Sequence, residues 1–447
     1  MCYIIIIMEL SKEQEIVLEK FMEGQNIFLT GPGGTGKTEL IKIMKTRAEY
    51  HYKKIQVCAL TGCAAVLLNC KAKTVHSWAG IGLGNGSIED NVKKIIDNKF
   101  KCKNWVKTDI LVIDEVSMMS MKLFEMLDLI GKGVRQNDKP FGGIQIIFSG
   151  DFYQLPPVGD EKFCFESPIW NETFPNHIQL TKIFRQRDPI FTNILNEIRE
   201  GKLSKNNRNI LKEHVNKTYN IIKPTKILPT RDKVEYINKT ELNALETKEY
   251  VHKVKKILDL PMTSKEKQIR SNYGDEQIDY ELNYLQNNLI CDSIVKLKVG
   301  AQVMCVINIE LDDSISLCNG SQGIITSYEN DIPVVTFTNG IKMPFEYHVW
   351  QSETIPGIGV SQIPLILAWA ITIHKSQGST MDIAEIDVGS SIFECGQTYV
   401  ALSRVKTLDG LYLTSFDHKK IKVNEKVSDF YNNLVLESVN KIELNNN

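Results

Sequence analysis

The feature that most constrains this 447-residue chain is a glycine-rich run near its start, Gly31-Pro32-Gly33-Gly34-Thr35-Gly36-Lys37-Thr38. The apolar residues Ile27–Leu29 before it predict a buried strand, and residues 39–50 after it predict a helix. In the order strand, loop, helix, glycines let backbone N–H groups surround a phosphate at a helix N-terminus. The run therefore predicts a P-loop; a glycine-rich turn with a chance lysine is the alternative.

Two side chains of this loop have expected roles of their own. Lys37 reaches the β- and γ-phosphates of ATP, and Thr38 holds Mg²⁺. The other residues expected to bind the nucleotide are Gly31, Gly33, Gly34, Thr35 and Gly36.

A second candidate for the same site follows another apolar run. Residues 110–113 are Ile-Leu-Val-Ile, which predicts a buried strand that delivers Asp114 to the edge of the sheet. An aspartate there binds Mg²⁺, and Glu115 orients or deprotonates the attacking water. Two exposed carboxylates that merely end a strand are the alternative.

Three more polar side chains are candidates for contact with the γ-phosphate. Gln154 lies shortly after the predicted strand 144–149 and is a candidate sensor. Arg185 and Arg404 are candidate arginine fingers, which accelerate hydrolysis by about 10³–10⁵. In isolation, each of the three would be read as an ordinary loop or surface residue.

Composition bounds the class of protein. A hydrophobic content of 43% and a charged content of 24% are typical of a globular chain, and the length predicts two or more domains. The net charge of −1 excludes a globally basic nucleic-acid binder but leaves a local basic groove open. Ten cysteines without a CxxC pair indicate a reducing, intracellular compartment; Cys58, Cys63 and Cys70 lack a zinc spacing.

The N-terminal residues 1–9 are expected to be a leader. Ile4–Ile7 are too few to span a bilayer, no basic segment precedes them, and Met8 is a second possible start. Neither a signal peptide nor an organelle presequence is evident. Nucleus, viral setting and bacterial cytoplasm all fit this pattern.

The pattern along the chain predicts two α/β regions with parallel sheets. Residues 79–105 carry no sheet strand and form a small excursion within the first region, glycine-rich at Gly80-Ile81-Gly82-Leu83-Gly84 and then helical. Residues 247–292 are polar and show no clear period. Residues 299–362 contain short strands with Asn-Gly turns at 319–320 and 339–340, which predict an inserted β-barrel.

Several runs together resemble the PIF-type DNA helicases of superfamily one, subgroup B, with RecD-like helicases as more distant relatives. The resemblance covers about residues 10–415 and rests on specific motifs. These are Leu10-Ser11-Lys12-Glu13-Gln14, Lys139-Pro140-Phe141-Gly142-Gly143-Ile144-Gln145, Gly150-Asp151-Phe152-Tyr153-Gln154-Leu155-Pro156-Pro157-Val158, Leu180-Thr181-Lys182-Ile183-Phe184-Arg185-Gln186 and Ala401-Leu402-Ser403-Arg404.

The resemblance implies a domain plan of two RecA-like P-loop domains with two insertions. Residues 10–184 form domain 1A, with a 1B wedge at about 79–105. Residues 185–298 and 363–430 form domain 2A, and residues 299–362 form an SH3-like 2B insertion. Residues 431–447 are expected to fray.

The resemblance also implies further site residues. Gln14 reads adenine, and Gln377 and Gly378 couple the grip on the strand to the γ-phosphate. A single strand of DNA is expected to contact Thr61, Gly62, Thr74, His76, Ser77, Trp78, Thr372, His374, Lys375 and Ser376. For Trp78, stacking on a base competes with an ordinary place in the core.

The implied activity is an ATP- and Mg²⁺-dependent, 5′-to-3′ DNA helicase in replication, repair, recombination or telomere maintenance. Its partners are single-stranded DNA and forked or tailed duplexes, without a membrane, and it acts as a monomer. A translocase that separates duplexes poorly and a RecD-like subunit of a larger complex are alternatives. A small-molecule kinase would need neither the two arginine motifs nor the barrel.

Overall fold

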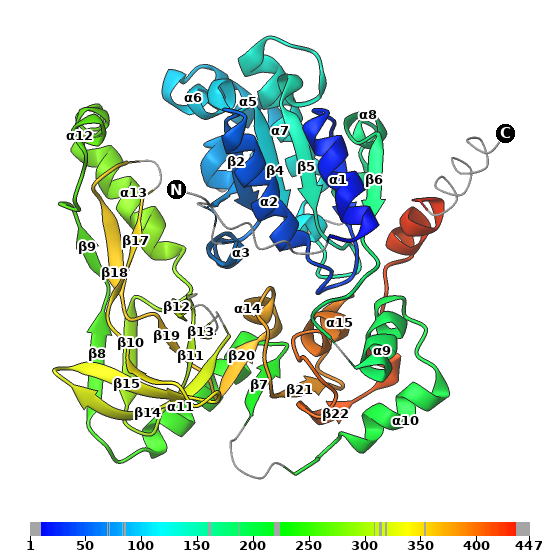
Figure 1. The fold of residues 1–447 in the computed structure, drawn as a ribbon, viewed down its shortest axis with the longest axis vertical. Helices are drawn as coiled ribbons and strands as arrows, with labels where there is room; N and C mark the ends of the chain where they lie inside the picture. Colours follow the sequence, from blue (N-terminus) through cyan, green and yellow to red (C-terminus); the bar gives the residue numbers. More distant parts are fainter. Residues whose placement is uncertain are drawn as a thin grey trace. The chain divides into compact units, whose positions relative to one another are not determined.

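A computed structural model of the chain separates into two compact units (Figure 1). It describes residues 10–68, 70, 72–82, 84, 86–159, 162–186, 188–218, 224–307, 309–312, 315–317, 320–352 and 355–434. The first unit comprises Met1–Ser204, Glu394–Tyr399 and Ile421–Asn447, and the second comprises Lys205–Phe393 and Val400–Lys420. The expected leader, Leu83, Asn319 and residues 435–447 lie outside the described residues.

The first unit is built on a six-stranded parallel sheet in the order β3-β2-β4-β5-β1-β6. Its strands are β1 (Ile27–Thr30), β2 (Ile55–Ala59), β3 (Lys73–Thr74), β4 (Ile110–Asp114), β5 (Gln145–Ser149) and β6 (Asn176–Gln179). Its helices are α1 (Lys12–Met22), α2 (Lys37–Tyr50), α3 (Gly62–Leu67), α4 (Val75–Ala79), α5 (Ile88–Ile96), α6 (Lys99–Lys107), α7 (Met121–Arg135), α8 (Trp170–Thr173) and α9 (Pro189–Arg199).

Both faces of this sheet are covered, which explains why its central strands are continuously apolar. On one face, Val17 of α1 and Ile41 of α2 pack with Ile27 and Leu29 of β1. On the other face, α5, α6 and α7 share a core with Phe28 and Phe148. The sheet thus lies between two helical layers, and the carboxyl ends of its parallel strands meet at one edge.

The sequence predicted β1, β4 and β5 to within one residue of their observed bounds. The helical excursion at 79–105 is present as α5 and α6, after α4 ends at Gly80 with a φ of 75°. The first unit, however, continues past the expected end at Phe184 and includes α9.

The C-terminal boundary also differs from the expectation. Residues 425–434 are helical and belong to the first unit, not to the second. Val427 and Tyr431 are 1% and 5% exposed in the core of the first unit. Tyr431 is therefore a core residue and not the start of a frayed tail, because its ring and hydroxyl both have partners there.

The second unit contains a four-stranded parallel sheet in the order β20-β7-β21-β22. These strands are β7 (Thr225–Leu228), β20 (Ala370–Thr372), β21 (Ala384–Val388) and β22 (Leu411–Phe416). Its helices are α10 (Lys205–Glu213), α11 (Arg231–Ala244), α12 (Ser264–Arg270), α13 (Asp275–Asn287), α14 (Ile373–Ser376) and α15 (Gln397–Leu402), and the boundary between the units falls within α15. The expected second α/β region is thus confirmed.

The expected β-rich insertion is an antiparallel sheet in the order β16-β15-β14-β11-β19. Its strands are β11 (Gln302–Cys305), β14 (Gln322–Glu329), β15 (Ile332–Phe337), β16 (Lys342–Pro344) and β19 (Leu365–Leu367). The predicted turn at Gly340 joins β15 to β16 with a φ of 85°. Strands β12 (Ile309–Asp312) and β13 (Ile315–Leu317) pair separately.

The polar segment 247–292, which showed no clear period, is largely ordered. It forms β8 (Glu249–Lys253) and β9 (Lys255–Ile257) before α12 and α13, and β10 (Ile294–Lys298) follows. Strand β9 pairs with β18 (Gly359–Gln362), which also pairs with β17 (His348–Gln351). The side chains of α13 that pack there, Ile278 and Leu282, supply the apolar contacts that the polar composition concealed.

Candidate nucleotide site and nucleic-acid contacts

The P-loop connects β1 to α2 at the carboxyl edge of the first sheet. Gly31, Gly34 and Gly36 have φ values of 141°, 86° and 84°, which side chains rarely adopt. A Cβ on Gly34 would also lie 2.5 Å from the Cβ of Arg185. Helix α2 begins after Gly36 without a side-chain cap, so its first N–H groups suit an anion. The loop therefore fits a phosphate, as expected from the sequence.

Lys37 and Thr35 point back onto the loop itself. The Nζ of Lys37 donates to the carbonyls of Gly31 and Pro32 at 2.7 and 3.0 Å. The buried hydroxyl of Thr35 donates to the carbonyl of Pro32 at 2.9 Å. Burial lowers the pKa of Lys37, and the charges of Asp151, Glu115 and Asp114 oppose that shift. The ammonium group thus lies among the carboxylates that end the neighbouring strands.

Asp114 and Glu115 end β4, as the sequence predicted. Asp114 is 6% exposed. Burial and the adjacent Glu115 raise the pKa of Asp114 to about 6. Glu115 has a φ of 56°, a left-handed conformation that is costly for this residue type and recurs at functional sites. The two carboxylates therefore lie together at the carboxyl end of β4.

Gln154 and Arg185 lie in the same unit as the P-loop. Gln154 is 6% exposed, and its backbone N–H donates to the carbonyl of Asp151 at 2.9 Å. The backbone N–H groups of Phe184 and Arg185 donate to the carbonyl of Gly34 at 2.8 and 3.3 Å. Burial lowers the pKa of Arg185, and Tyr399 and Glu115 oppose the shift. Arg185 thus meets the nucleotide loop from a segment outside it, and Gln154 lies beside Asp151.

Gln14 meets the other side of the loop from α1. Its side chain accepts from the backbone N–H of Ser11 at 3.0 Å, which closes a capping box at the start of α1. Its Nε2 donates to the carbonyl of Thr35 at 3.4 Å. A Cβ on Gly36 would lie 3.0 Å from the same Nε2. The expected adenine reader therefore lies directly against the phosphate loop.

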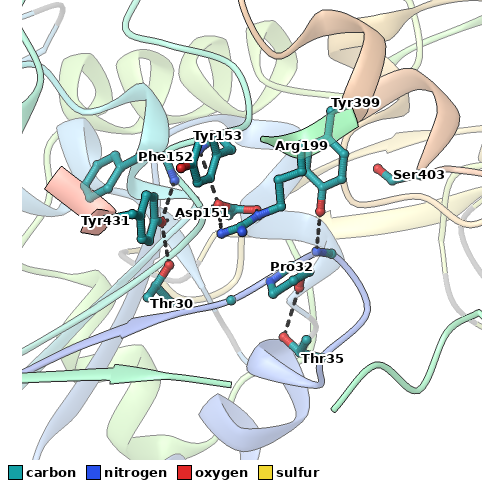
Figure 2. A network of polar contacts seen from close by, with 12 residues as sticks. Thr30, Pro32, Thr35, Asp151, Phe152, Tyr153, Arg199, Tyr399, Ser403 and Tyr431 are labelled. Atoms are coloured by element: carbon teal, nitrogen blue, oxygen red, sulfur yellow. Dashed lines mark hydrogen bonds and ion pairs between the residues drawn. The ribbon is translucent and has the colours of Figure 1, made fainter. Parts of the chain in front are cut away.

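A buried polar network, which the sequence did not reveal, surrounds Asp151 beside this site (Figure 2). Arg199 of α9 donates to Asp151 through Nε and Nη2 at 2.8 and 2.9 Å. Burial alone would lower the pKa of Arg199, but the charge and hydrogen bonds of Asp151 raise it above its ordinary value. The guanidinium also lies over the rings of Tyr153 and Tyr431, at 4.4 and 5.2 Å.

The hydroxyl of Tyr431 connects this network to the strand that leads into the P-loop. It lies 2.6 Å from the hydroxyl of Thr30, and it accepts from the backbone N–H of Phe152 at 3.1 Å (Figure 2). The ring of Tyr431 stacks on Tyr153 at 4.7 Å. A separate tyrosine, Tyr399, accepts from the backbone N–H of Gly33 at 2.8 Å. The sequence signal that could have found Tyr431 is the aromatic pair Phe430-Tyr431 near the end of the chain.

The second arginine candidate belongs to the second unit. Arg404 is 2% exposed, and its Nε and Nη2 donate to the carbonyl of Val400 and the hydroxyl of Ser403, each at 2.7 Å. Its Nη1 donates to the carbonyl of Ser379 at 3.4 Å. Gln377 and Gly378 lie in the turn just before Ser379, where Gly378 has a φ of 80°. The arginine therefore contacts the residue that directly follows the predicted coupling turn.

Three threonines among the expected DNA contacts have the same local role. Thr61, Thr74 and Thr372 each accept from a backbone N–H three residues ahead, at 3.2, 3.3 and 3.1 Å. Each thereby caps a short helix (α3, α4 or α14) that follows a parallel strand. Gly62, His76, Ser77, His374 and Lys375 lie in the first turns of these helices, and burial lowers the pKa of His76.

Two expected DNA contacts are corrected by the structure. Trp78 is 1% exposed, and its ring packs on Trp105 of α6 at 4.4 Å, so the structure places it in the core. Ser376 is fully buried, and its hydroxyl donates to the carbonyl of Ile373 at 2.8 Å. Both side chains stabilise the helices that carry the remaining candidates.

Comparisons with known proteins agree with this combination of fold and site. A model of the PIF1-like helicase family matches residues 9–209, and a model of the DNA helicase Pif1 2B domain matches residues 281–328. The protein named ATP-dependent DNA helicase RRM3 from Saccharomyces cerevisiae is 33% identical over 95% of this chain and 68% of its own length. The one named ATP-dependent DNA helicase PIF1 from Emericella nidulans is 35% identical over 94% of this chain.

Solved structures extend the likeness to the fold. The Pif1 helicase from Candida albicans is 35% identical, with a TM-score of 0.74 over 95% of this chain and 99% of that one. Bacteroides Pif1 in complex with ADP-AlF4 is 30% identical, with a TM-score of 0.78 over 96% and 98% of the two chains. The protein is an α/β P-loop protein, and it belongs to the PIF1-like helicase family. It spans 63% of the Emericella nidulans relative and 64% of the Xenopus laevis one.

Proposed function

We propose that this chain is an ATP-dependent DNA helicase that moves 5′ to 3′ along a single strand and separates duplexes. The observation that carries the proposal is the uncapped start of α2 beside Asp114, Gln154 and Arg185 in one unit of a PIF1-like helicase. A phosphate acceptor, a metal-binding carboxylate and γ-phosphate contacts are the parts that phosphoryl transfer requires.

The donor set of the first unit fits ATP with Mg²⁺. Thr38 and Asp114 supply a hydroxyl and a carboxylate, the oxygen ligands that Mg²⁺ prefers. When bound, the metal neutralises charge on the phosphates. Lys37 must release the carbonyls of Gly31 and Pro32 to meet a phosphate. Glu115 is the residue that we propose orients the attacking water. The hydrogen bonds of Lys37 to the loop carbonyls thus keep the loop ordered, and phosphate oxygens replace those carbonyls when nucleotide binds.

The proposed track is a single strand of DNA. Three short helices begin after capping threonines, which are Thr61, Thr74 and Thr372. Two of these helices carry His76 or Lys375 in their first turn, and these side chains can contact phosphate oxygens. Arg404 is the proposed second finger, coupled to the strand through Gln377 and Gly378. In domain terms, the first unit contains 1A with a 1B wedge, and the second contains 2A with an SH3-like 2B insertion.

The proposed setting follows the family. Replication, repair, recombination and telomere maintenance all present tailed or forked duplexes, and a monomer in an intracellular compartment would serve them. Bacteroides Pif1 has been solved bound to single-stranded DNA and to ADP-AlF3, which supports a nucleotide and a strand as ligands here. Among the described helices, none has the length and apolar character to span a bilayer.

Lys37→Ala tests the proposal, with Lys42→Ala as the matched control. Lys42 lies on the same helix, has a side chain that is 39% exposed, and pairs with Glu39 at 2.8 Å. We expect wild type and Lys42→Ala to separate a 5′-tailed duplex with ATP and Mg²⁺. Lys37→Ala should bind the tail with unchanged affinity but neither hydrolyse ATP nor separate strands. ATP hydrolysis by Lys37→Ala at the wild-type rate would contradict the assignment of this loop as the ATP site.

A further inference from the structure

Helix α6 carries one strongly basic face. At 3.6 residues per turn, Lys99, Lys103 and Lys107 recur every four residues and form a single stripe. All three are exposed. The rise of 1.5 Å per residue spaces their backbone positions by about 6 Å over about 12 Å. Phe100 and Val106, which flank this stripe, are 66% and 60% exposed.

The opposite face of α6 anchors the helix to the proposed strand-binding turn. Trp105 packs on Trp78 of α4, and its Nε1 donates to the carbonyl of Ala79 at 3.2 Å. Asn104 donates to the carbonyl of Trp78 at 2.9 Å, and Arg135 donates to the carbonyl of Trp105 at 2.9 Å. The lysine stripe is therefore fixed to α4, whose first turn carries His76 and Ser77.

The chain around this face has an excess of positive charge. From Lys93 to Asp109 it has six lysines and two carboxylates, Asp97 and Asp109, although the net charge of the whole chain is −1. Within the part of the chain that the structure describes, no ion pair involves a lysine of the stripe. Burial and the charge of Lys94 lower the pKa of Lys101, which lies on the same helix. So many like charges on one rigid element suit a polyanion.

We propose that the Lys99, Lys103 and Lys107 face of α6 binds the phosphate backbone of the double-stranded part of a tailed DNA. The inference rests on the proposed function and names a contact for the duplex that awaits separation. Lysine side chains on a convex helix are flexible point charges and do not match the edges of particular bases. They therefore suit contacts with the phosphates of the DNA backbone. A single strand is instead held in a groove with several stacking aromatics, whereas Phe100 is the only exposed aromatic of α6.

The test replaces all three lysines by glutamine and measures affinity without ATP over a series of salt concentrations. The probes are a single-stranded oligonucleotide and the same oligonucleotide extended into a duplex. Each duplex phosphate contact contributes about 0.9 to the slope of log affinity against log salt. We expect the slope for the tailed duplex to become shallower by about 2.7, and its affinity at about 0.1 M salt to fall at least tenfold. Single-strand affinity and strand-stimulated ATPase should remain those of the wild type.

Two controls separate this contact from general charge effects. Lys12, Lys53 and Lys139 are exposed and scattered over the same unit, so their triple glutamine variant removes the same charge without a stripe. The triple arginine variant of the α6 lysines keeps the charge and should keep the wild-type slope.

The other outcomes overturn the inference. If the glutamine variant lost as much affinity for the single strand as for the tailed duplex, the stripe would bind the single strand. If the salt dependence of duplex affinity did not change, the stripe would be a solvated face. If wild-type ATPase did not respond to single-stranded DNA, the proposed function itself would fail, whereas an unaltered triple variant beside an active wild type refutes only the duplex contact.

Discussion

The ion pair between Arg199 and Asp151 should be the most sensitive polar contact in the first unit. The two side chains are 5% and 0% exposed, and two hydrogen bonds of 2.8 and 2.9 Å join them. Arg199→Met removes the cation and leaves the Asp151 carboxylate buried without it. Breaking such a pair from one side costs about 3–5 kcal/mol of unfolding free energy. For a unit of about 240 residues, this loss lowers the melting temperature by roughly 10 °C.

A matched exposed pair and a double variant make this prediction sharp. Arg231 and Glu235 form an exposed pair at 2.6 Å, with side chains 79% and 62% exposed. Arg231→Met should lower the free energy of unfolding by less than about 1 kcal/mol, because water screens exposed ion pairs. Adding Asp151→Asn to Arg199→Met should recover part of the loss, because no unpaired charge then remains.

Calorimetric unfolding of the full chain measures both variants and the double variant. The transition of the first unit should shift for Arg199→Met, and the transition of the second unit, which contains Arg231, should stay in place for Arg231→Met. Equal shifts for the two arginine variants, or strictly additive losses in the double variant, would refute the argument from burial.

Three further predictions concern single side chains. Arg404→Ala should leave nucleotide affinity largely intact and reduce strand-stimulated ATP turnover by about 10³-fold or more, and a collapse of nucleotide affinity instead would make Arg404 structural. Trp78→Ala should cost about 3–5 kcal/mol of stability through its lost contact with Trp105, and weaker single-strand binding without any loss of stability would restore the stacking role. Tyr431→Phe keeps the stack on Tyr153 but removes the hydroxyl partner of Thr30 and Phe152, so unfolding should become easier by about 1–2 kcal/mol; equal stability of this variant would show that the hydroxyl contributes nothing.

The nucleotide loop was predictable because its signals are local. The strand Ile27–Thr30, the glycines with positive φ and the start of α2 adjoin one another in the chain. The strand that delivers Asp114 is equally local, because four apolar residues precede the carboxylate. Such short-range patterns fix both the element and the edge at which its last side chain emerges.

The parts that escaped prediction depend on partners far apart in the chain. Arg199 meets Asp151 across 48 residues, and Tyr431 meets it across 280. For Trp78 the sequence left base stacking and a core position open, because its partner Trp105 is 27 positions away on another helix. No periodicity in the sequence predicts such pairings, because these residues meet only after the folded sheet brings its loops together.

The most direct test of the central claim compares two matched DNA forks, one with a 5′ single-stranded tail and one with a 3′ tail, in the presence of ATP and Mg²⁺. The account predicts separation of the 5′-tailed fork alone, and no separation by Lys37→Ala. Separation of only the 3′-tailed fork would contradict the proposed direction. Separation of neither fork, with ATPase still stimulated by single strands, would contradict the helicase assignment and leave a translocase.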